Sequence, residues 1–240
     1  MMNEFTEGPM TLAEMRKIIS LLENPPEALM IRRALRFYEV PKDLEYKWGI
    51  YKGTESDHVH KILDHFDCPQ DKYELEQMLK LVAGKERVLE IGSSFGGTLK
   101  RMAAVMKKGS QLVSVDNPVD STPKFLNPLA SLKETCRQIS ILGGNVELFT
   151  GDSHNKALIE AVRKFAPFDF GFIDGDHTYE GVKLDWENYS PMCKIVALHD
   201  IVGPVEGCHR FWDELKATTN YRTEEFIGGM KFGIGVVYRE

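Results

Sequence analysis

The segment VLEIGSSFGGT, residues 88–98, contains an apolar strand, a glycine-rich turn and the start of a helix. Glycine lets the backbone approach a ligand closely, and the first turn of a helix points free N–H groups toward it. A dinucleotide-binding fingerprint needs three glycines at spacings of two and three, but Gly92 is followed by Ser94 and Phe95. The segment therefore predicts a ligand-binding turn in an α/β fold, and it disfavours a diphosphate ligand.

After Gly84, short apolar runs alternate with helical stretches, which is typical of a parallel sheet covered on both faces. The expected strands cover residues 87–91, 111–116, 145–150, 168–174 and 195–199, and the expected helices cover residues 98–107, 129–142, 156–165, 180–189 and 205–216. Two more strand-like runs, 221–227 and 231–239, flank a short turn that contains Gly228 and Gly229. The sequence predicts a Rossmann-like, doubly wound sheet of seven strands whose last two form a hairpin.

Residues 1–70 follow a different pattern from the rest of the chain. Apolar residues at helical spacing predict amphipathic helices over 11–23 and 28–39, and proline ends each of them. A further helix is expected over 73–82, and Trp48 and Tyr51 are candidates for a lid over a ligand. We expect residues 1–70 to form a helical cap or lid segment and residues 71–240 to form one α/β domain.

Composition excludes several classes of protein. Thirty basic and thirty-six acidic side chains give a net charge of −6, so we expect neither nucleic acid nor a membrane surface as a partner. No apolar run approaches the ~18 residues of a membrane span, and the first ten residues lack the pattern of a signal peptide. The four cysteines, Cys68, Cys136, Cys193 and Cys208, show no CxxC spacing, so we expect reduced thiols and a cytoplasmic location.

Acidic residues lie at or near the carboxyl ends of the first three strands of the expected sheet. Glu90, two residues before Gly92, suits a cationic or amine-bearing ligand and would repel a pyrophosphate. Asp116 ends the second strand, where an acid can accept both hydroxyls of a ribose. The third strand is followed by Gly151–Ser153, which suits an adenine edge, and then by His154, which either lies near that adenine or caps the next helix.

A second cluster of polar residues follows the fourth and fifth strands. Because ligands bind beyond the carboxyl ends of such strands, we expect Asp174, His199 and Asp200 to converge. Two carboxylates together with substrate oxygens would suit Mg²⁺, which lowers the pKa of a substrate hydroxyl. His177 is the candidate general base and Asp176 the reserve. The alternative for these two residues is that they only cap the helix that follows.

These motifs, in this order, resemble those of the class I S-adenosylmethionine-dependent methyltransferases over about residues 70–238. The glycine-rich turn, FIDGDH at 172–177 and LHD at 198–200 look like the branch that includes macrocin-type and cephalosporin-hydroxylase-like O-methyltransferases. The resemblance implies that Glu90 lies near the methionine moiety, that Asp116 binds the ribose and that Asp152 lies near the adenine. The remaining cofactor-binding residues that we expect are Gly92, Ser94, Gly96 and Asp174.

The resemblance also bears on the metal and on the activity. Related metal-dependent O-methyltransferases place an aspartate after the fourth strand and two adjacent acid or amide ligands after the fifth. Asp174 and Asp200 match this pattern, whereas His199 stands where an oxygen ligand is expected. That departure puts Mg²⁺ in doubt, or favours Mn²⁺, Fe²⁺ or Zn²⁺. The implied activity is methyl transfer to an oxygen of a small hydroxylated metabolite or sugar.

Three other functions stay open. One is an NAD(P)-dependent oxidoreductase on the same kind of sheet, which the glycine spacing disfavours. Another is an iron-dependent oxygenase that uses Asp174, His177 and His199 as a facial triad, although such sites usually occupy barrels. The third is a module that binds S-adenosylmethionine without turnover. The sequence identifies neither the methyl acceptor nor the oligomeric state, although the helical N-terminus could pair subunits in a homo-oligomer.

Overall fold

The structure is a computed structural model in which residues 70–118, 128–141, 143–203, 205–229 and 232–239 are described. The chain divides into two units, Met1–Phe66 and Asp67–Glu240. The helices expected over 11–23 and 28–39, and the lid candidates Trp48 and Tyr51, lie outside the described residues. A cap or lid formed by residues 1–70 therefore stays a prediction.

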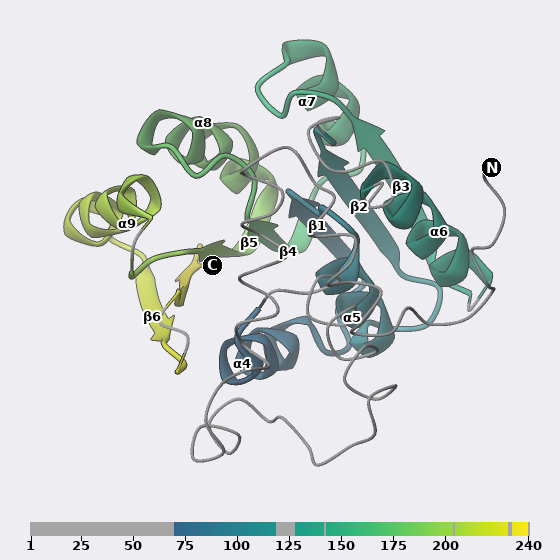
Figure 1. Cartoon of the computed structure of the whole chain (residues 1–240), viewed down its shortest axis with the longest axis horizontal. Helices are drawn as coiled ribbons and strands as arrows, with labels where there is room; N and C mark the ends of the chain where they lie inside the picture. The colour runs from purple at the N-terminus through teal and green to yellow at the C-terminus, as the bar shows by residue number, and fades with distance from the viewer. Residues whose placement is uncertain (1–69, 119–127, 142, 204, 230–231, 240) are drawn as a thin grey trace, which may run out of the picture. The chain divides into compact units, whose positions relative to one another are not determined.

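Seven strands form one mixed sheet, as the sequence predicts (Figure 1). They are β1 (Arg87–Ile91), β2 (Gln111–Asp116), β3 (Asn145–Thr150), β4 (Phe168–Ile173), β5 (Cys193–His199), β6 (Arg222–Phe226) and β7 (Ile234–Tyr238). Their order is β3-β2-β1-β4-β5-β7-β6, in which β1 to β5 are parallel and β7 is antiparallel to both of its neighbours. Because Phe226 pairs with Ile234, residues 227–233 connect the hairpin, which is a longer connection than the short turn that we expected.

The helices that precede and connect the strands begin and end within one or two residues of their predicted positions. They are α4 (Lys72–Val82), α5 (Gly97–Val105), α6 (Pro128–Ile141), α7 (Lys156–Arg163), α8 (Tyr179–Tyr189) and α9 (Glu206–Thr218), with a short 3-10 turn, η1, at Ser190–Met192. Polar side chains fix the starts of three of them: Asp71, Asn155 and Thr178 each accept a backbone N–H of the following helical turn. Within the described ranges, no helix is long and apolar enough to cross a membrane.

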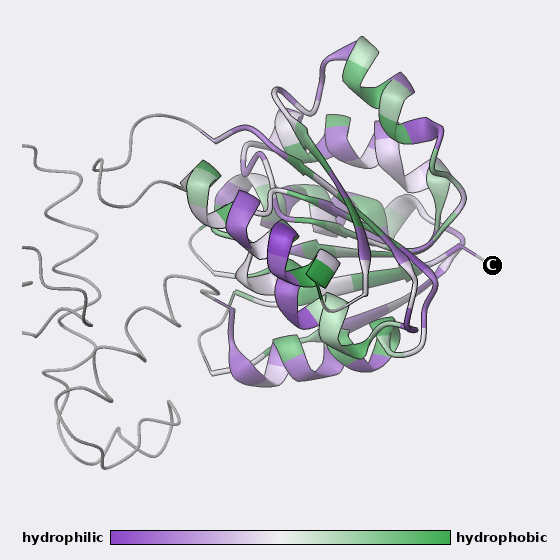
Figure 2. Ribbon diagram, turned by 90° about the vertical axis from the view of Figure 1, so that its right-hand side faces the viewer, coloured by the Kyte–Doolittle hydropathy of each residue, from purple (hydrophilic) through white to green (hydrophobic). Residues whose placement is uncertain are grey.

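Two apolar cores lie on opposite faces of the sheet. Side chains alternate along each strand, so Val88 faces one core and both Leu89 and Ile91 face the other. Helices α4, α5 and α6 cover the face of Val88, whereas α7, α8 and α9 cover the opposite face. The helices carry both hydrophilic and hydrophobic residues, as the colours of Figure 2 show. This three-layer arrangement leaves the carboxyl ends of the parallel strands as the edge at which a ligand can bind.

Candidate active site

A cavity of about 380 Å³ lies at the carboxyl ends of β1 to β4. Its lining comes from the turn after β1, the end of β2 and the segments that follow β3 and β4. The predicted site residues that line it are Gly92, Ser94, Asp116, Asp152, Asp174, Asp176 and His177. Strand order thus brings together residues that are up to 85 positions apart in the sequence, from Gly92 to His177.

Gly92 is required by a close approach of two strand ends. Its φ is 86°, and a Cβ added there would lie 2.1 Å from the carbonyl oxygen of Asp174. Backbone hydrogen bonds fix this arrangement, because Gly92 N donates to Val115 O at 2.8 Å and Asp174 N donates to Ile91 O at 2.8 Å. The sequence suggested that a glycine is needed at position 92 so that a ligand can approach. In the structure, Gly92 is needed because the backbone of Asp174, after β4, lies too close for a Cβ.

The turn after β1 binds the carboxylate at the end of β2. Ser94 has a positive φ of 49°, and its N–H donates to Oδ1 of Asp116 at 2.9 Å. Burial raises the pKa of Asp116, and backbone hydrogen bonds from Ser94 and Ser93 oppose this effect. Asp116 is therefore a nearly buried acceptor at the edge of the cavity. Gly96, the N-cap of α5, is not among the lining residues.

Glu90 is also absent from the lining of the cavity. It alternates with Leu89 and Ile91, so its side chain is on the face covered by α4, α5 and α6. The carboxyl is fully buried and accepts a hydrogen bond from the Ser93 hydroxyl at 2.6 Å. Burial raises the pKa of Glu90 to about 8, against the lowering effect of that hydrogen bond, so the neutral acid dominates at pH 7. Contact between Glu90 and a methionine moiety stays a prediction.

The segment after β3 places a histidine in the lining of the cavity. Asp152 accepts the backbone N–H of His154 at 2.9 Å, and Asn155 is the N-cap of α7. The alternative that His154 caps this helix is therefore wrong. Nε2 of His154 lies 3.2 Å from the carbonyl oxygen of Gly181 and 3.2 Å from Oδ1 of Asp185, which is buried in α8.

Two histidines and two aspartates converge after β4 and β5, as adjacency of these strands predicts. Nδ1 of His199 lies 3.1 Å from Oδ1 of Asp174 and 3.5 Å from Oδ1 of Asp200. Nδ1 of His177 lies 2.6 Å from Oδ2 of Asp200, and its Nε2 lies 3.9 Å from Oδ1 of Asp174. Asp200 has a positive φ of 60°, a strained conformation for a residue other than glycine.

The carboxylates favour the charged form of both imidazoles. Burial alone would lower the pKa of His199, but Asp174 and then Asp200 outweigh it and raise the pKa to about 9. The hydrogen bond to Asp200 raises the pKa of His177, and burial opposes it. The His177 side chain is about half exposed, at 47%, whereas that of His199 is buried. His177 is therefore the more accessible of the two rings.

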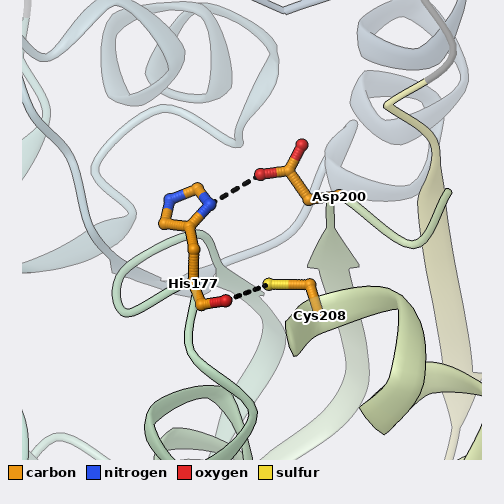
Figure 3. A group of neighbouring side chains, drawn as sticks. All are labelled: His177, Asp200 and Cys208. Carbon is orange, nitrogen blue, oxygen red and sulfur yellow. Dashed lines mark hydrogen bonds and ion pairs between the residues drawn. The ribbon is translucent and has the colours of Figure 1, made fainter. Parts of the chain in front are cut away.

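Asp176 and His177 differ in how they relate to α8. Oδ1 of Asp176 accepts the N–H of Thr178 at 2.8 Å, and the Thr178 hydroxyl, the N-cap, accepts the N–H of Gly181 at 3.0 Å. Asp176 thus supports the start of the helix. The His177 ring lies against Asp200 instead (Figure 3). The capping alternative applies to Asp176 and fails for His177.

Among the described residues, two overlapping groups have potential metal-ligand atoms within 4.8 Å of one another: Asp174, His199 and Asp200, and His177, Asp200 and Cys208. In the second group the His177 ring is turned toward Asp200, while the Cys208 thiol donates to the carbonyl oxygen of His177 at 3.8 Å (Figure 3). Burial raises the pKa of Cys208 to about 12, so the thiolate that a metal needs is disfavoured. The first group is the better candidate.

The sequence gives no signal for Gln70, which also reaches the site. Its side-chain Nε2 donates to Oδ2 of Asp174 at 2.9 Å across 104 positions of sequence. Gln70 belongs to no motif, and it precedes α4, which packs in the same core as Phe172 of β4 and Ala197 of β5. Such a contact depends on tertiary structure alone.

Comparisons with known proteins agree with this geometry. Residues 89–201 match the family described as a methyltransferase domain. The O-methyltransferase from Bacillus cereus, solved in complex with SAH, is similar in structure, with a TM-score of 0.54 and 17% identity over 81% of this chain and 96% of that chain. A comparison with curated proteins finds no significant match.

Two further solved structures cover nearly the whole chain. The O-methyltransferase TomG from Streptomyces achromogenes, involved in tomaymycin synthesis and solved with SAM, has a TM-score of 0.51 and 17% identity over 99% of both chains. A methyltransferase from Geobacter sulfurreducens has a TM-score of 0.52 and 13% identity over 97% of this chain and 98% of that chain. At these identities the similarity establishes a shared fold.

Proposed function

We propose that this protein transfers a methyl group from S-adenosylmethionine to an oxygen of a small hydroxylated molecule, because residues 89–201 match the methyltransferase-domain family and the fold is shared with solved O-methyltransferases. The domain assignment favours methyl transfer over the oxidoreductase and oxygenase alternatives. The observation that carries the proposal is the Asp116 carboxylate, which Ser94 N–H binds at the edge of a cavity that Asp152 and Asp174 also line.

The arrangement of acids suits the charges and polar groups of this cofactor. In our proposal Asp116 accepts the ribose hydroxyls and the exposed Asp152 carboxylate lies near the adenine. Asp174 supplies negative charge for the cationic methionine end of the cofactor. Transfer is a displacement at an activated sulfonium carbon, so the protein needs to supply alignment, exclusion of water and removal of one proton.

His177 is the residue that we propose as the general base. Asp200 orients the ring through Nδ1 at 2.6 Å, and the half-exposed side chain leaves Nε2 at the edge of the cavity. The acceptor oxygen attacks the methyl carbon, the carbon–sulfur bond breaks to release S-adenosylhomocysteine, and the hydroxyl proton passes to Nε2 of the neutral His177 ring, whose Nδ1–H faces Asp200. Asp176 is less suited to this role because it binds the start of α8.

Binding of S-adenosylhomocysteine tests the cofactor assignment. We expect calorimetry to detect binding by the wild-type protein and a roughly 100-fold weaker affinity for Asp116→Ala, because each hydrogen bond to a charged group contributes about 1.5–3 kcal/mol. Asp213→Ala, which removes an exposed acid of α9, is the matched control and should bind normally. A wild-type protein that binds neither S-adenosylmethionine nor S-adenosylhomocysteine would overturn the proposal.

Substitution of the base separates catalysis from binding. His177→Ala should lower methyl transfer from labelled S-adenosylmethionine to a panel of hydroxylated acceptors by roughly 10²–10⁴-fold. Its affinity for S-adenosylhomocysteine should stay within about twofold, since the ring binds Asp200 at 2.6 Å and lies 3.9 Å from Asp174, beyond hydrogen-bond distance. His209→Ala on the exposed side of α9 is the control. If His177→Ala retained full activity, His177 would not be the base.

We also propose a divalent cation as an assisting group, held by Asp174, His199 and Asp200. Their converging donor atoms, two carboxylates and one imidazole, fit a borderline ion such as Mn²⁺ better than Mg²⁺. A bound ion would lower the pKa of the acceptor hydroxyl. The chain itself holds the carboxylates of Asp174 and Asp200 close to Nδ1 of His199, so that the three ligand groups converge.

Titration with Mn²⁺ alone distinguishes the two possible groups of ligands. We expect the wild-type protein to bind Mn²⁺ and Asp200→Asn to bind it at least about tenfold more weakly, because one charged ligand is lost while asparagine tolerates the positive φ. Cys208→Ser should bind as the wild type does. Equal loss in both variants would favour His177, Asp200 and Cys208, and absence of Mn²⁺ binding in the wild type would remove the metal from the proposal.

A further inference from the structure

Gln70 and His199 bind opposite oxygens of the Asp174 carboxylate. Nε2 of Gln70 donates to Oδ2 at 2.9 Å, and Nδ1 of His199 lies 3.1 Å from Oδ1. Gln70 is only 7% exposed, and its Oε1 is buried with no hydrogen-bond partner among the described residues. Each oxygen of the Asp174 carboxylate therefore has a side-chain partner. Gln70, which precedes the N-cap of α4, binds one oxygen, and His199, at the end of β5, binds the other.

The turn that carries Gln70 is itself held in place. Glu74, in the first turn of α4, is fully buried, and its Oε1 accepts the N–H groups of Gly228 at 2.7 Å and Gly233 at 3.0 Å. A Cβ at Gly228 would lie 2.0 Å from Oδ1 of Asp71, so this glycine permits close contact with the N-cap of α4. The start of α4 is therefore fixed against the connection between β6 and β7.

The same connection also reaches the end of β5. Val202 N donates to Phe232 O at 2.9 Å, and the Phe232 ring lies 6.0 Å from the His199 ring, centroid to centroid. His199 alternates with Leu198, whose side chain is in the core of α7, α8 and α9, so the His199 ring is on the face that α4 covers. The connection between β6 and β7 therefore contacts both the start of α4, which carries Gln70, and the end of β5, which carries His199.

We propose that Gln70 is a positioning residue of the methyl-transfer site, which fixes the Asp174 carboxylate in the lining of the cavity. This inference rests on the proposed function, in which Asp174 faces the cationic end of the cofactor. An amide suits the task, because it donates one N–H and leaves the negative charge of the carboxylate in place. A lysine or arginine there would neutralise that charge.

A double-mutant cycle tests whether Gln70 acts through Asp174. Gln70→Met keeps the length of the side chain and removes the donor, and Asp174→Asn removes the charge. We expect Gln70→Met to weaken S-adenosylhomocysteine binding about tenfold in the wild-type background and less than twofold in the Asp174→Asn background. Gln77→Met is the matched control on α4. The exposed Gln77 side chain accepts a hydrogen bond from Lys80 of the same helix and is not a partner of Asp174. This variant should bind normally.

Several outcomes would overturn the inference. Equal losses in both backgrounds would mean that Gln70 acts through general stability, and unchanged binding by Gln70→Met would mean that Asp174 needs no positioning. If Gln70→Met does not fold, Gln70→Asn replaces it, since a side chain shorter by one methylene cannot reach Oδ2 and should give the same loss.

If the wild-type protein binds no S-adenosylhomocysteine, the proposed function fails and the positioning contact is tested in the free protein. The ¹⁵N resonances of the His199 ring report on Asp174, because Nδ1 contacts its Oδ1. Gln70→Met should shift them and Gln77→Met should not. Unshifted resonances in Gln70→Met would overturn the inference.

Discussion

Gly92→Ala is expected to lower the free energy of unfolding by about 3–5 kcal/mol, in the range of severe steric and backbone effects. The added Cβ would lie 2.1 Å from the carbonyl oxygen of Asp174 at a φ of 86°. The backbone cannot yield easily, because Gly92 N and Asp174 N both donate within the parallel ladder of β2, β1 and β4. Urea denaturation would measure the loss, and S-adenosylhomocysteine binding should disappear with it.

Gly84→Ala is the matched control for this substitution. Gly84 has a φ of 72°, and a Cβ there would have no heavy atom within 4 Å, so only the backbone conformation is penalised. That penalty is about 1 kcal/mol. The difference between the two variants isolates the collision with Asp174. Equal destabilisation of the two proteins would show that the turn after β1 can relax and that close approach does not require Gly92.

Glu90→Gln is expected to stabilise the protein increasingly as the pH rises. The folded-state pKa of Glu90 is raised to about 8 from its usual 4.5 because the carboxyl is buried. Below pH 4.5 the group is neutral in both states. Between pH 4.5 and 8 it ionises only in the unfolded state, so wild-type stability falls across this window and levels off above it. The loss amounts to roughly 2–5 kcal/mol, since one pKa unit corresponds to 1.36 kcal/mol.

Denaturation midpoints of the wild type and of Glu90→Gln should therefore diverge between about pH 4.5 and 8 and keep a constant difference above this window. Glutamine keeps an acceptor for the Ser93 hydroxyl, so the comparison isolates the ionisation. Glu134→Gln is the control: a hydrogen bond from Arg137 lowers the pKa of the exposed Glu134 to about 2, and its removal should add no pH dependence in this range. A constant difference between wild type and Glu90→Gln at every pH would contradict neutral burial of Glu90.

Sequence patterns predicted the sheet closely because its strands are short apolar runs separated by turn residues. Strands β1, β2 and β3 begin and end where periodicity placed them. The hairpin was less well predicted. Gly228 and Gly229 indicated a short turn, but the connection spans residues 227–233. Within it, the backbone N–H groups of Gly228 and Gly233 donate to Glu74 of α4. Local turn signals carry no information about such a distant acceptor.

The site was predictable to the extent that it depends on strand order. Asp174, His199 and Asp200 follow adjacent parallel strands, so their convergence followed from topology. The face on which Glu90 lies was harder to predict, because both faces of this sheet are apolar and alternation does not mark the side with the cavity. Gln70 could not be predicted, since its contact crosses 104 residues and needs the packing of α4.

The hydrogen bonds of Glu74 also bear on how the molecule is made. A ribosome synthesises α4 before the five parallel strands and the connection between β6 and β7 after them, yet Glu74 of α4 accepts N–H groups from Gly228 and Gly233 of that connection. The buried carboxyl therefore has no backbone donors from this connection until residues 228–233 have been synthesised. Nascent chains that stall between residues 199 and 228 should carry all five parallel strands and still lack the support that orders Gln70 beside Asp174.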